Sequence, residues 1–143
     1  MLEHFDNPDS AISNISRILK PEGQIWISCP NIKSWQRKIF GRYWINWHVP
    51  FHIIHFTRDV LARILQESAF EIKEDQQVSP ALWVAQSIIV RLFSKPGQPT
   101  RQLRNPFLVA FLIVLIRCIL FPVLWLGNLL GRGDCLVVVA KKV

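Results

Sequence analysis

The sequence predicts a mixed α/β fold, because amphipathic helical segments alternate with short apolar runs typical of buried strands. A helix, a turn and a strand follow one another twice within residues 1–78, and a third strand-like run lies near the C-terminus. The chain has 143 residues, of which 50% are hydrophobic and 19% charged. This length and composition predict one compact domain with a packed core and exclude general disorder.

The first α/β unit is predicted from residues 7–29. Asn7 and Pro8 provide an N-cap and a proline at the first helical position, and apolar residues then recur at helical spacing up to Leu19. A turn at residues 21–23 leads into residues 24–29, a short β-branched and apolar run that ends at a proline. Such a run is typical of a strand buried in a sheet.

The second α/β unit follows a segment rich in Trp, His and Phe. Residues 34–40 predict a short helix, and the rest of the segment up to residue 56 predicts an ordered loop of the kind that carries specificity. Thr57 is placed to cap a helix whose apolar face includes Leu65. Alternating residues 69–74 then predict a second, more exposed strand.

Residues 80–133 are strongly apolar. A helix is predicted from Pro80 to about residue 93, and residues 94–100 have the composition of a linker. Residues 106–126 contain a single charged side chain, and a helix of that length is about 31 Å long, comparable to the hydrocarbon thickness of a bilayer. Residues 131–134 predict a turn, and residues 135–140 predict a third, central strand.

If that third strand joins the same sheet as residues 24–29, both ends of the apolar segment lie on one side of any membrane. A single crossing is then excluded. Pro122 predicts a bend, which leaves a helical hairpin whose arms are both shorter than the roughly 30 Å needed to span. Two environments remain open: an interfacial or re-entrant hairpin, where Arg117 can reach lipid head groups, and a hairpin buried against protein or a second subunit.

The net charge and the cysteines indicate which binding partners and which cellular compartment are expected. A net charge of +7 suits an acidic partner, but the basic residues are scattered and no nucleic-acid-binding motif is present. We therefore expect no nucleic acid and favour a membrane surface. The three cysteines form no disulfide framework or CxxC pair, and no signal peptide is recognisable, so we expect a cytoplasmic protein associated with membrane through residues 105–131.

Several short motifs, taken together, resemble a known family. They are Leu2-Glu3-His4, Asn7-Pro8, the helix end and turn at residues 18–23, and the strand end at residues 27–31. This pattern resembles the class I S-adenosylmethionine-dependent methyltransferases, in their small-molecule and lipid-modifying branch. Similarity continues to about residue 78, and residues 134–142 are similar to the family's closing antiparallel strand. The chain departs from the pattern at Glu22, where the family has glycine.

The resemblance implies a partial Rossmann-like methyltransferase sheet, with three C-terminal strands and flanking helices, that carries an apolar helical-hairpin insertion. Residues 1–79 would form the C-terminal half of the α/β domain, 80–133 the insertion, and 134–143 the closing strand. The family binds S-adenosylmethionine chiefly through an upstream glycine-rich turn, which these 143 residues lack. We therefore interpret the chain as a fragment or a truncated gene product that is inactive alone.

The resemblance also places candidate site residues. The backbone at Glu3 and His4 would line the cofactor pocket at the carboxyl ends of the strands. The alternative is a helix-capping loop without a ligand.

A second group of candidates lies in the aromatic loop, which holds three of the four histidines. Transfer to a hydroxyl needs a positioned acceptor and a base near neutral pH, which suits an imidazole. His52 is the predicted base, and the predicted substrate-binding residues are Trp44, His48 and His55. These histidines can instead be structural, and a metal site on one helix face is disfavoured by Pro50, so no metal is assigned.

Two functions are therefore carried forward. The first is methyl transfer from S-adenosylmethionine to a small or lipid-like acceptor. The alternative is a non-catalytic membrane-associated remnant or interaction module. The sequence gives no basis for naming the acceptor or the oligomeric state.

Overall fold

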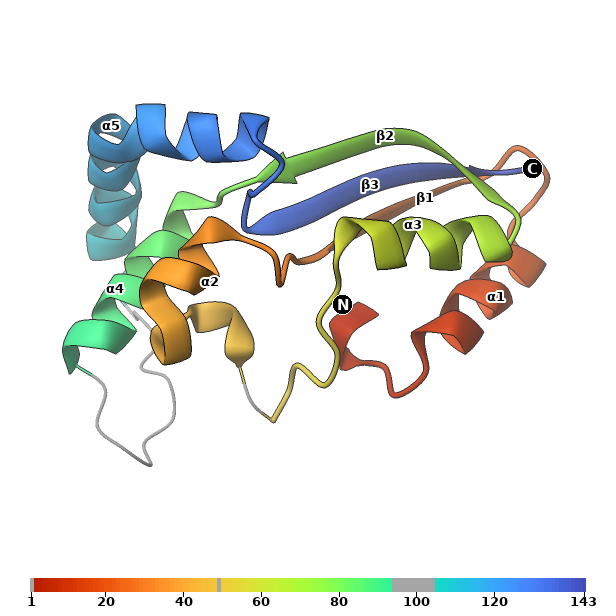
Figure 1. Ribbon diagram of the computed structural model, residues 1–143, viewed down its shortest axis with the longest axis horizontal. Helices are drawn as coiled ribbons and strands as arrows, with labels where there is room; N and C mark the ends of the chain where they lie inside the picture. Colours follow the sequence, from red (N-terminus) through yellow and green to blue (C-terminus); the bar gives the residue numbers. More distant parts are fainter. Residues whose placement is uncertain (1, 49, 94–104) are drawn as a thin grey trace.

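The computed structural model describes residues 2–48, 50–93 and 105–143 (Figure 1). Its centre is a three-stranded sheet in the order β1–β3–β2, and β3 is antiparallel to both neighbours. The strands are β1 (Gln24–Pro30), β2 (Phe70–Val78) and β3 (Cys135–Lys142). The C-terminal run is thus the central strand, as predicted. Being flanked on both sides explains why it is apolar at almost every position.

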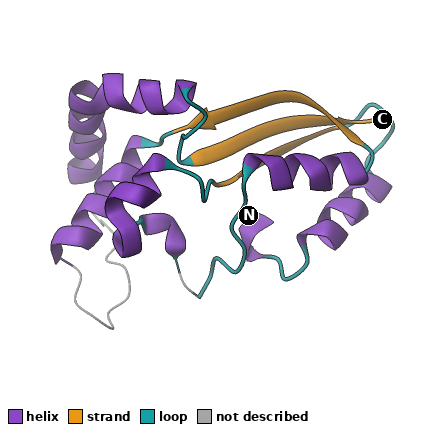
Figure 2. Cartoon of the chain, viewed as in Figure 1, coloured by secondary structure: helices purple, strands orange, loops and turns teal. Residues whose placement is uncertain are grey.

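Helices α1 (Pro8–Ile18) and α3 (Arg58–Glu67) lie along one face of the sheet (Figures 1 and 2). Both begin at the predicted caps: the Asn7 side chain accepts a hydrogen bond from the Ser10 amide, and Thr57 accepts one from the Val60 amide. Their apolar faces and the sheet form the main core. Its most buried members are Ile12, Cys29, Phe56, Leu61, Leu65, Phe70, Leu136 and Ala140.

Strand β2 is longer than the sequence predicts. The prediction ended at residue 74, whereas the strand continues to Val78 through Asp75 and two glutamines. Those polar residues carry no alternating hydrophobic signal. They remain extended because they pair with apolar β3, where Gln77 lies opposite Leu136, and because an edge strand tolerates polar side chains.

Short helical turns follow β1. Helix α2 (Trp35–Phe40) is capped by the Ser34 hydroxyl and matches the predicted short helix. Two 3₁₀ turns, η2 (Gly41–Tyr43) and η3 (Ile45–Trp47), then lead into a loop that runs to Thr57. This order places the aromatic loop beside η1 (Leu2–His4), because the Ile53 and Ile54 amides both donate to the Glu3 carbonyl.

Two apolar helices form a second packed unit at one end of the sheet. They are α4 (Ala81–Phe93) and α5 (Pro106–Leu129), and their contact buries Val84, Ala85, Ile116 and Leu124. Figure 1 shows α5 as two arms joined by a sharp bend. Pro122 lies inside this helix and cannot donate to the helical ladder, and a proline inside a helix is a common cause of such a bend. The predicted linker at residues 94–100 lies outside the described residues.

Candidate functional site

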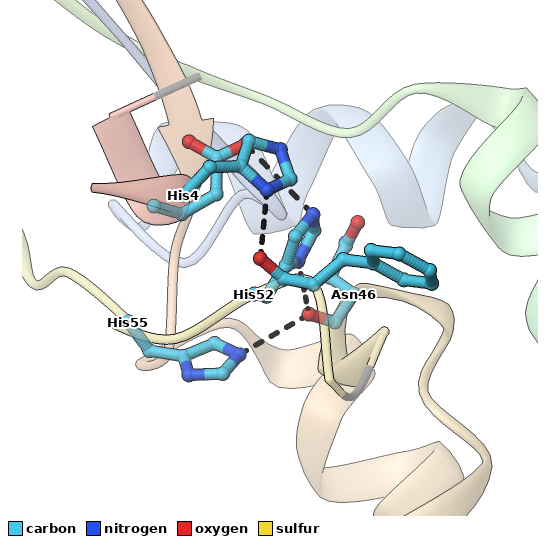
Figure 3. A network of polar contacts seen from close by, with 6 residues as sticks. His4, Asn46, His52 and His55 are labelled. Carbon is cyan, nitrogen blue, oxygen red and sulfur yellow. Dashed lines mark hydrogen bonds and ion pairs between the residues drawn. The ribbon is translucent and has the colours of Figure 1, made fainter. Parts of the chain in front are cut away.

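The Glu3–His4 segment and the histidine loop meet just before α1. Glu3 is buried with 6% of its surface exposed, while Leu2 packs into the main core. The His4 ring donates through Nδ1 to the Phe51 carbonyl at 2.7 Å, which fastens η1 to the loop (Figure 3). Two regions about 50 residues apart in sequence therefore form one site.

Asn46 organises the loop histidines. His52 Nδ1 lies 2.8 Å from the Asn46 carbonyl oxygen, and His55 Nε2 lies 3.2 Å from the same oxygen (Figure 3). A carbonyl only accepts, so the facing ring nitrogens carry the hydrogens. In neutral His52 this leaves the lone pair on Nε2.

Glu3 faces two of the imidazole rings. Its Oε1 lies 3.7 Å from His4 Nε2 and 3.9 Å from His52 Nε2. Burial lowers the pKa of His52 below its ordinary value, against the opposing effects of the hydrogen bond to Asn46 and the charge of Glu3. Burial thus favours the neutral form of His52, in which Nε2 can accept a proton.

The buried carboxylate of Asp134 holds this loop in place through hydrogen bonds. Asp134 is fully buried, and its Oδ1 accepts hydrogen bonds from the Ser34 hydroxyl at 2.6 Å and the Trp44 indole at 2.8 Å. Its Oδ2 accepts from the Asn46 amide at 3.1 Å. Burial raises the pKa of Asp134 to about 6, although the three hydrogen bonds lower it. Asp134 therefore positions Asn46, which in turn orients His52 and His55.

The predicted substrate-binding residues occupy different environments. Trp44 is buried at 2% exposure, packs against the rings of Trp47 and His55, and is fastened to Asp134. His48 lies at the end of η3 with a positive φ of 33°, and its ring contacts His52. The structure gathers His4, His52 and His55 around two backbone carbonyls, and places Trp44 behind them as support.

Sequence reasoning missed Asp134 and Asn46. The sequence predicts a turn at Asp134, and the structure has one. The burial of Asp134, however, depends on contacts with residues about 90 to 100 positions earlier. Asn46 acts mainly through its backbone oxygen, which no side-chain pattern reveals. A carboxylate directly before a strongly apolar strand was the only available signal.

The helix-face histidine arrangement, which the sequence disfavours as a metal site, is not what the structure forms. Residues 50–56 contain no helix, so His48, His52 and His55 do not share a helix face. Among the described residues, the cluster with metal-ligand chemistry is instead Glu3, His4 and His52, whose donor atoms all lie within 4.8 Å of one another.

A hollow of about 420 Å³ runs beside Glu3 along strand β1. Its lining is mainly apolar and includes Phe5, Ile12, Trp26 and Cys29. Trp26 is 73% exposed although it lies within a strand. In the described sheet β1 pairs with β3 alone, so its other edge is open for a further strand.

Comparison with known proteins agrees with the predicted fold. The model of a family described as a methyltransferase domain matches residues 1–74. The fold is similar to the crystal structure of a SAM-dependent methyltransferase from Archaeoglobus fulgidus, with 17% identity and a TM-score of 0.53. The match covers 99% of this chain and 56% of that chain. No curated protein sequence matches significantly. The prediction of a partial methyltransferase fold is therefore confirmed.

Proposed function

The chain belongs to the methyltransferase domain family, and from this premise we propose that it is the acceptor-side half of an S-adenosylmethionine-dependent methyltransferase. The main support for the proposal is that Glu3 and His4 lie beside His52. The Nε2 atom of neutral His52 carries a lone pair that can accept a proton. A small or lipid-like molecule with a hydroxyl group is the proposed acceptor. The methyl group goes to the oxygen of that hydroxyl.

His52 is the proposed base. S-adenosylmethionine, when bound, supplies a methyl group on a positively charged sulfur, which becomes neutral as it keeps the electrons of the broken C–S bond. The acceptor oxygen forms the new O–C bond, and its proton goes to His52 Nε2. The Asn46 carbonyl holds the ring in the tautomer that this transfer needs, because it occupies the Nδ1 hydrogen. His48 and His55 flank the ring and would contact the acceptor.

Glu3 and His4 are the proposed cofactor contacts. The buried carboxylate of Glu3 suits the cationic sulfonium or the amino group of the cofactor. Both residues lie beside His52, and methyl transfer requires the cofactor and the acceptor to be held close together. The glycine-rich turn that cradles the rest of the cofactor is not among these 143 residues. We therefore expect the isolated chain to bind S-adenosylmethionine weakly, with further polypeptide pairing with the open edge of β1.

A direct test extends the chain at its N-terminus with the glycine-rich half of a methyltransferase domain. Calorimetry should then detect S-adenosylmethionine binding that the 143-residue chain lacks. In the extended protein, His52→Ala should lower turnover much more than it lowers cofactor affinity, with Val60→Ala on the outside of α3 as the matched control. Equal turnover in His52→Ala would remove His52 from the reaction, and micromolar binding to the short chain would overturn the missing-half interpretation.

We also propose that α4 and α5 hold the protein at a membrane surface. Among the described residues, α5 alone is long and apolar enough to cross a bilayer, yet only 11% of its most apolar 18-residue window is buried. A core helix of that composition would be mostly covered. The exposed apolar side chains include Phe107, Phe111, Val114, Ile119, Phe121, Trp125 and Leu129.

Helix α5 is attached to the α/β domain at its C-terminus and along its middle. Its C-terminus leads through five residues into central strand β3, and its middle packs on α4, which itself contacts η2 and η3. A bent helix held this way can enter one leaflet without crossing. Arg117 lies on α5, where it can extend its side chain to lipid head groups. The arrangement would place the site beside lipid acceptors.

Site-directed cysteine labelling in intact cells tests this topology. Single cysteines at positions 105 and 132, in a chain whose own three cysteines are replaced by serine, should react from the same side of the membrane. Labelling from opposite sides would overturn both the one-sided placement of the bent helix α5 and the placement of β3 in the sheet.

The exposed helix also favours the alternative function, a non-catalytic membrane-associated interaction module. In that case vesicle binding would persist while the extended protein would transfer no methyl group to any acceptor tested. Methyl transfer that depends on His52 would exclude it.

A further inference from the structure

Three ligand atoms of the kind found in metalloenzymes converge at the proposed active site. Glu3 Oε1 lies within 4 Å of both His4 Nε2 and His52 Nε2. We propose that these three residues form a binding site for a divalent transition-metal ion such as Zn²⁺. This goes beyond the proposed function and shares all three residues with it: a bound ion would replace the roles given above to Glu3 and His4 as cofactor contacts and to His52 as the base.

The distances fit such a site after a small adjustment. In a tetrahedral site with bonds of about 2.1 Å, neighbouring ligand atoms are about 3.4 Å apart. The two Glu3–histidine distances are 3.7 and 3.9 Å, and all three ligand atoms lie within 4.8 Å of one another. Side-chain movements of up to about 0.7 Å at each residue would bring the three atoms onto one ion.

The hydrogen bonds behind the rings already select the metal-binding tautomer. His4 donates through Nδ1 to the Phe51 carbonyl, and His52 donates through Nδ1 to the Asn46 carbonyl. In both neutral rings the lone pair therefore lies on Nε2, which is the atom that faces Glu3. Metal-bound histidines typically donate their other ring hydrogen to a carbonyl or carboxylate in this way.

The three side chains differ in exposure, so two ligands are enclosed and the third lies at the surface. The side chains of Glu3 and His52 are 8% and 11% exposed, whereas that of His4 is 45% exposed. An ion can therefore enter past His4, and its outer coordination positions would remain open to water or to an acceptor. The nearby Cys29 belongs to the core cluster and is outside the set of ligands.

The ligand set indicates the class of ion. Two imidazoles and one carboxylate suit Zn²⁺ and other borderline divalent transition metals, whereas Mg²⁺ and Ca²⁺ prefer sites made of oxygen atoms. A bound ion would occupy the lone pair that the proposed function gives to the acceptor's proton. His52 would then be a ligand, and the ion would lower the pKa of the acceptor hydroxyl directly.

Titration of the untagged, metal-free 143-residue protein with Zn²⁺ tests the site without cofactor or acceptor. Calorimetry in a mild detergent should give one ion per chain. Glu3→Gln and His4→Gln should each weaken binding by at least 10- to 100-fold, since changes behind the ligands already cost that much. The matched control is His55→Gln, which removes a ring on the same Asn46 carbonyl but outside the cluster, and should leave affinity within about 3-fold.

Further measurements test whether the variants fold and whether the bound ion has the expected geometry and selectivity. Far-UV circular dichroism confirms that each variant is folded, and His4→Gln changes a half-exposed ring that the core does not need. Co²⁺ should give the visible absorption of a tetrahedral nitrogen and oxygen site, and excess Mg²⁺ should not displace Zn²⁺. No binding, or equal binding in Glu3→Gln, His4→Gln and His55→Gln, would overturn the metal site.

Methyl transfer by the extended protein is measured separately. Transfer without metal binding would overturn the metal site alone. Metal binding without transfer would overturn the proposed function alone.

Discussion

The two ends of the molecule use apolar side chains in opposite ways. Around α1, α3 and the sheet, residues such as Leu61, Leu65 and Phe56 are completely buried by the chain itself. Around α5, Phe107 is 85% exposed and Leu129 is 63% exposed although the helix is more apolar than any other. The first region is a core that the chain itself buries completely, whereas the second leaves an apolar surface that requires lipid or protein to cover it.

Substituting matched leucines gives the largest expected difference between these regions. Leu65→Ala should lower the free energy of unfolding by about 2–5 kcal/mol, because it opens a cavity in the main core. Leu129→Ala, the same change on the exposed side of α5, should alter it by less than about 0.5 kcal/mol. Urea unfolding followed by circular dichroism measures both. Similar losses would mean that the α5 surface is covered within the folded chain.

Asp134 lies in the segment that joins α5 to β3, and its titration should change the stability of the folded chain. Its pKa is raised to about 6 from an ordinary value of 3.8, so the folded chain holds the proton more strongly than the unfolded chain. The contribution of Asp134 to stability is therefore most favourable below pH 3.8, decreases as the pH rises to about 6, and is constant above. The shift corresponds to about 3 kcal/mol.

Asp134→Asn removes this titration. The stability of the native chain relative to the variant should fall by about 3 kcal/mol between pH 3.5 and pH 7, measured by urea unfolding at both values. A relative stability that rises over this interval would contradict the assigned cause, because it would require a carboxylate that folding stabilises in its charged form.

Acidic substitutions on α5 should affect membrane binding rather than folding. Phe111→Asp combined with Ile119→Asp should weaken binding to vesicles of phosphatidylcholine and phosphatidylglycerol at least about 10-fold, because charged side chains oppose burial in lipid. Val60→Asp, on the exposed side of α3, is the control and should have little effect. Flotation measures the bound fraction. Unchanged binding, or dimers that the double variant disrupts, would favour a protein partner for this surface.

The smallest expected effect lies at the turn between α1 and β1. Glu22 has a positive φ of 68°, a conformation that disfavours side chains and suits glycine. Glu22→Gly should therefore raise the free energy of unfolding by about 0.5–1 kcal/mol, despite losing an exposed ion pair with Lys141. Thermal unfolding of the two proteins tests this. A lower melting temperature for Glu22→Gly would show that the ion pair outweighs the backbone strain.

Local signals in the sequence predicted most of the elements. Asn7 and Thr57 cap the helices that they were expected to cap, Pro122 lies in the bent helix, and the apolar C-terminal run is the central strand. These features depend on neighbouring residues or on the pattern of one segment, so they can be read without tertiary contacts. The departure at Glu22, where the resemblance implies glycine, was also visible, and its positive φ is a conformation that glycine adopts readily.

The site depended on tertiary structure. The histidine loop was recognised, but its pairing with Glu3 and His4 requires the Glu3 carbonyl to accept from the Ile53 and Ile54 amides. Asp134 holds the loop through hydrogen bonds donated by Ser34, Trp44 and Asn46, which lie 88 to 100 residues earlier in the sequence. Hydrogen bonds across such separations form only after the sheet has brought the segments together, and no periodicity in the sequence records them.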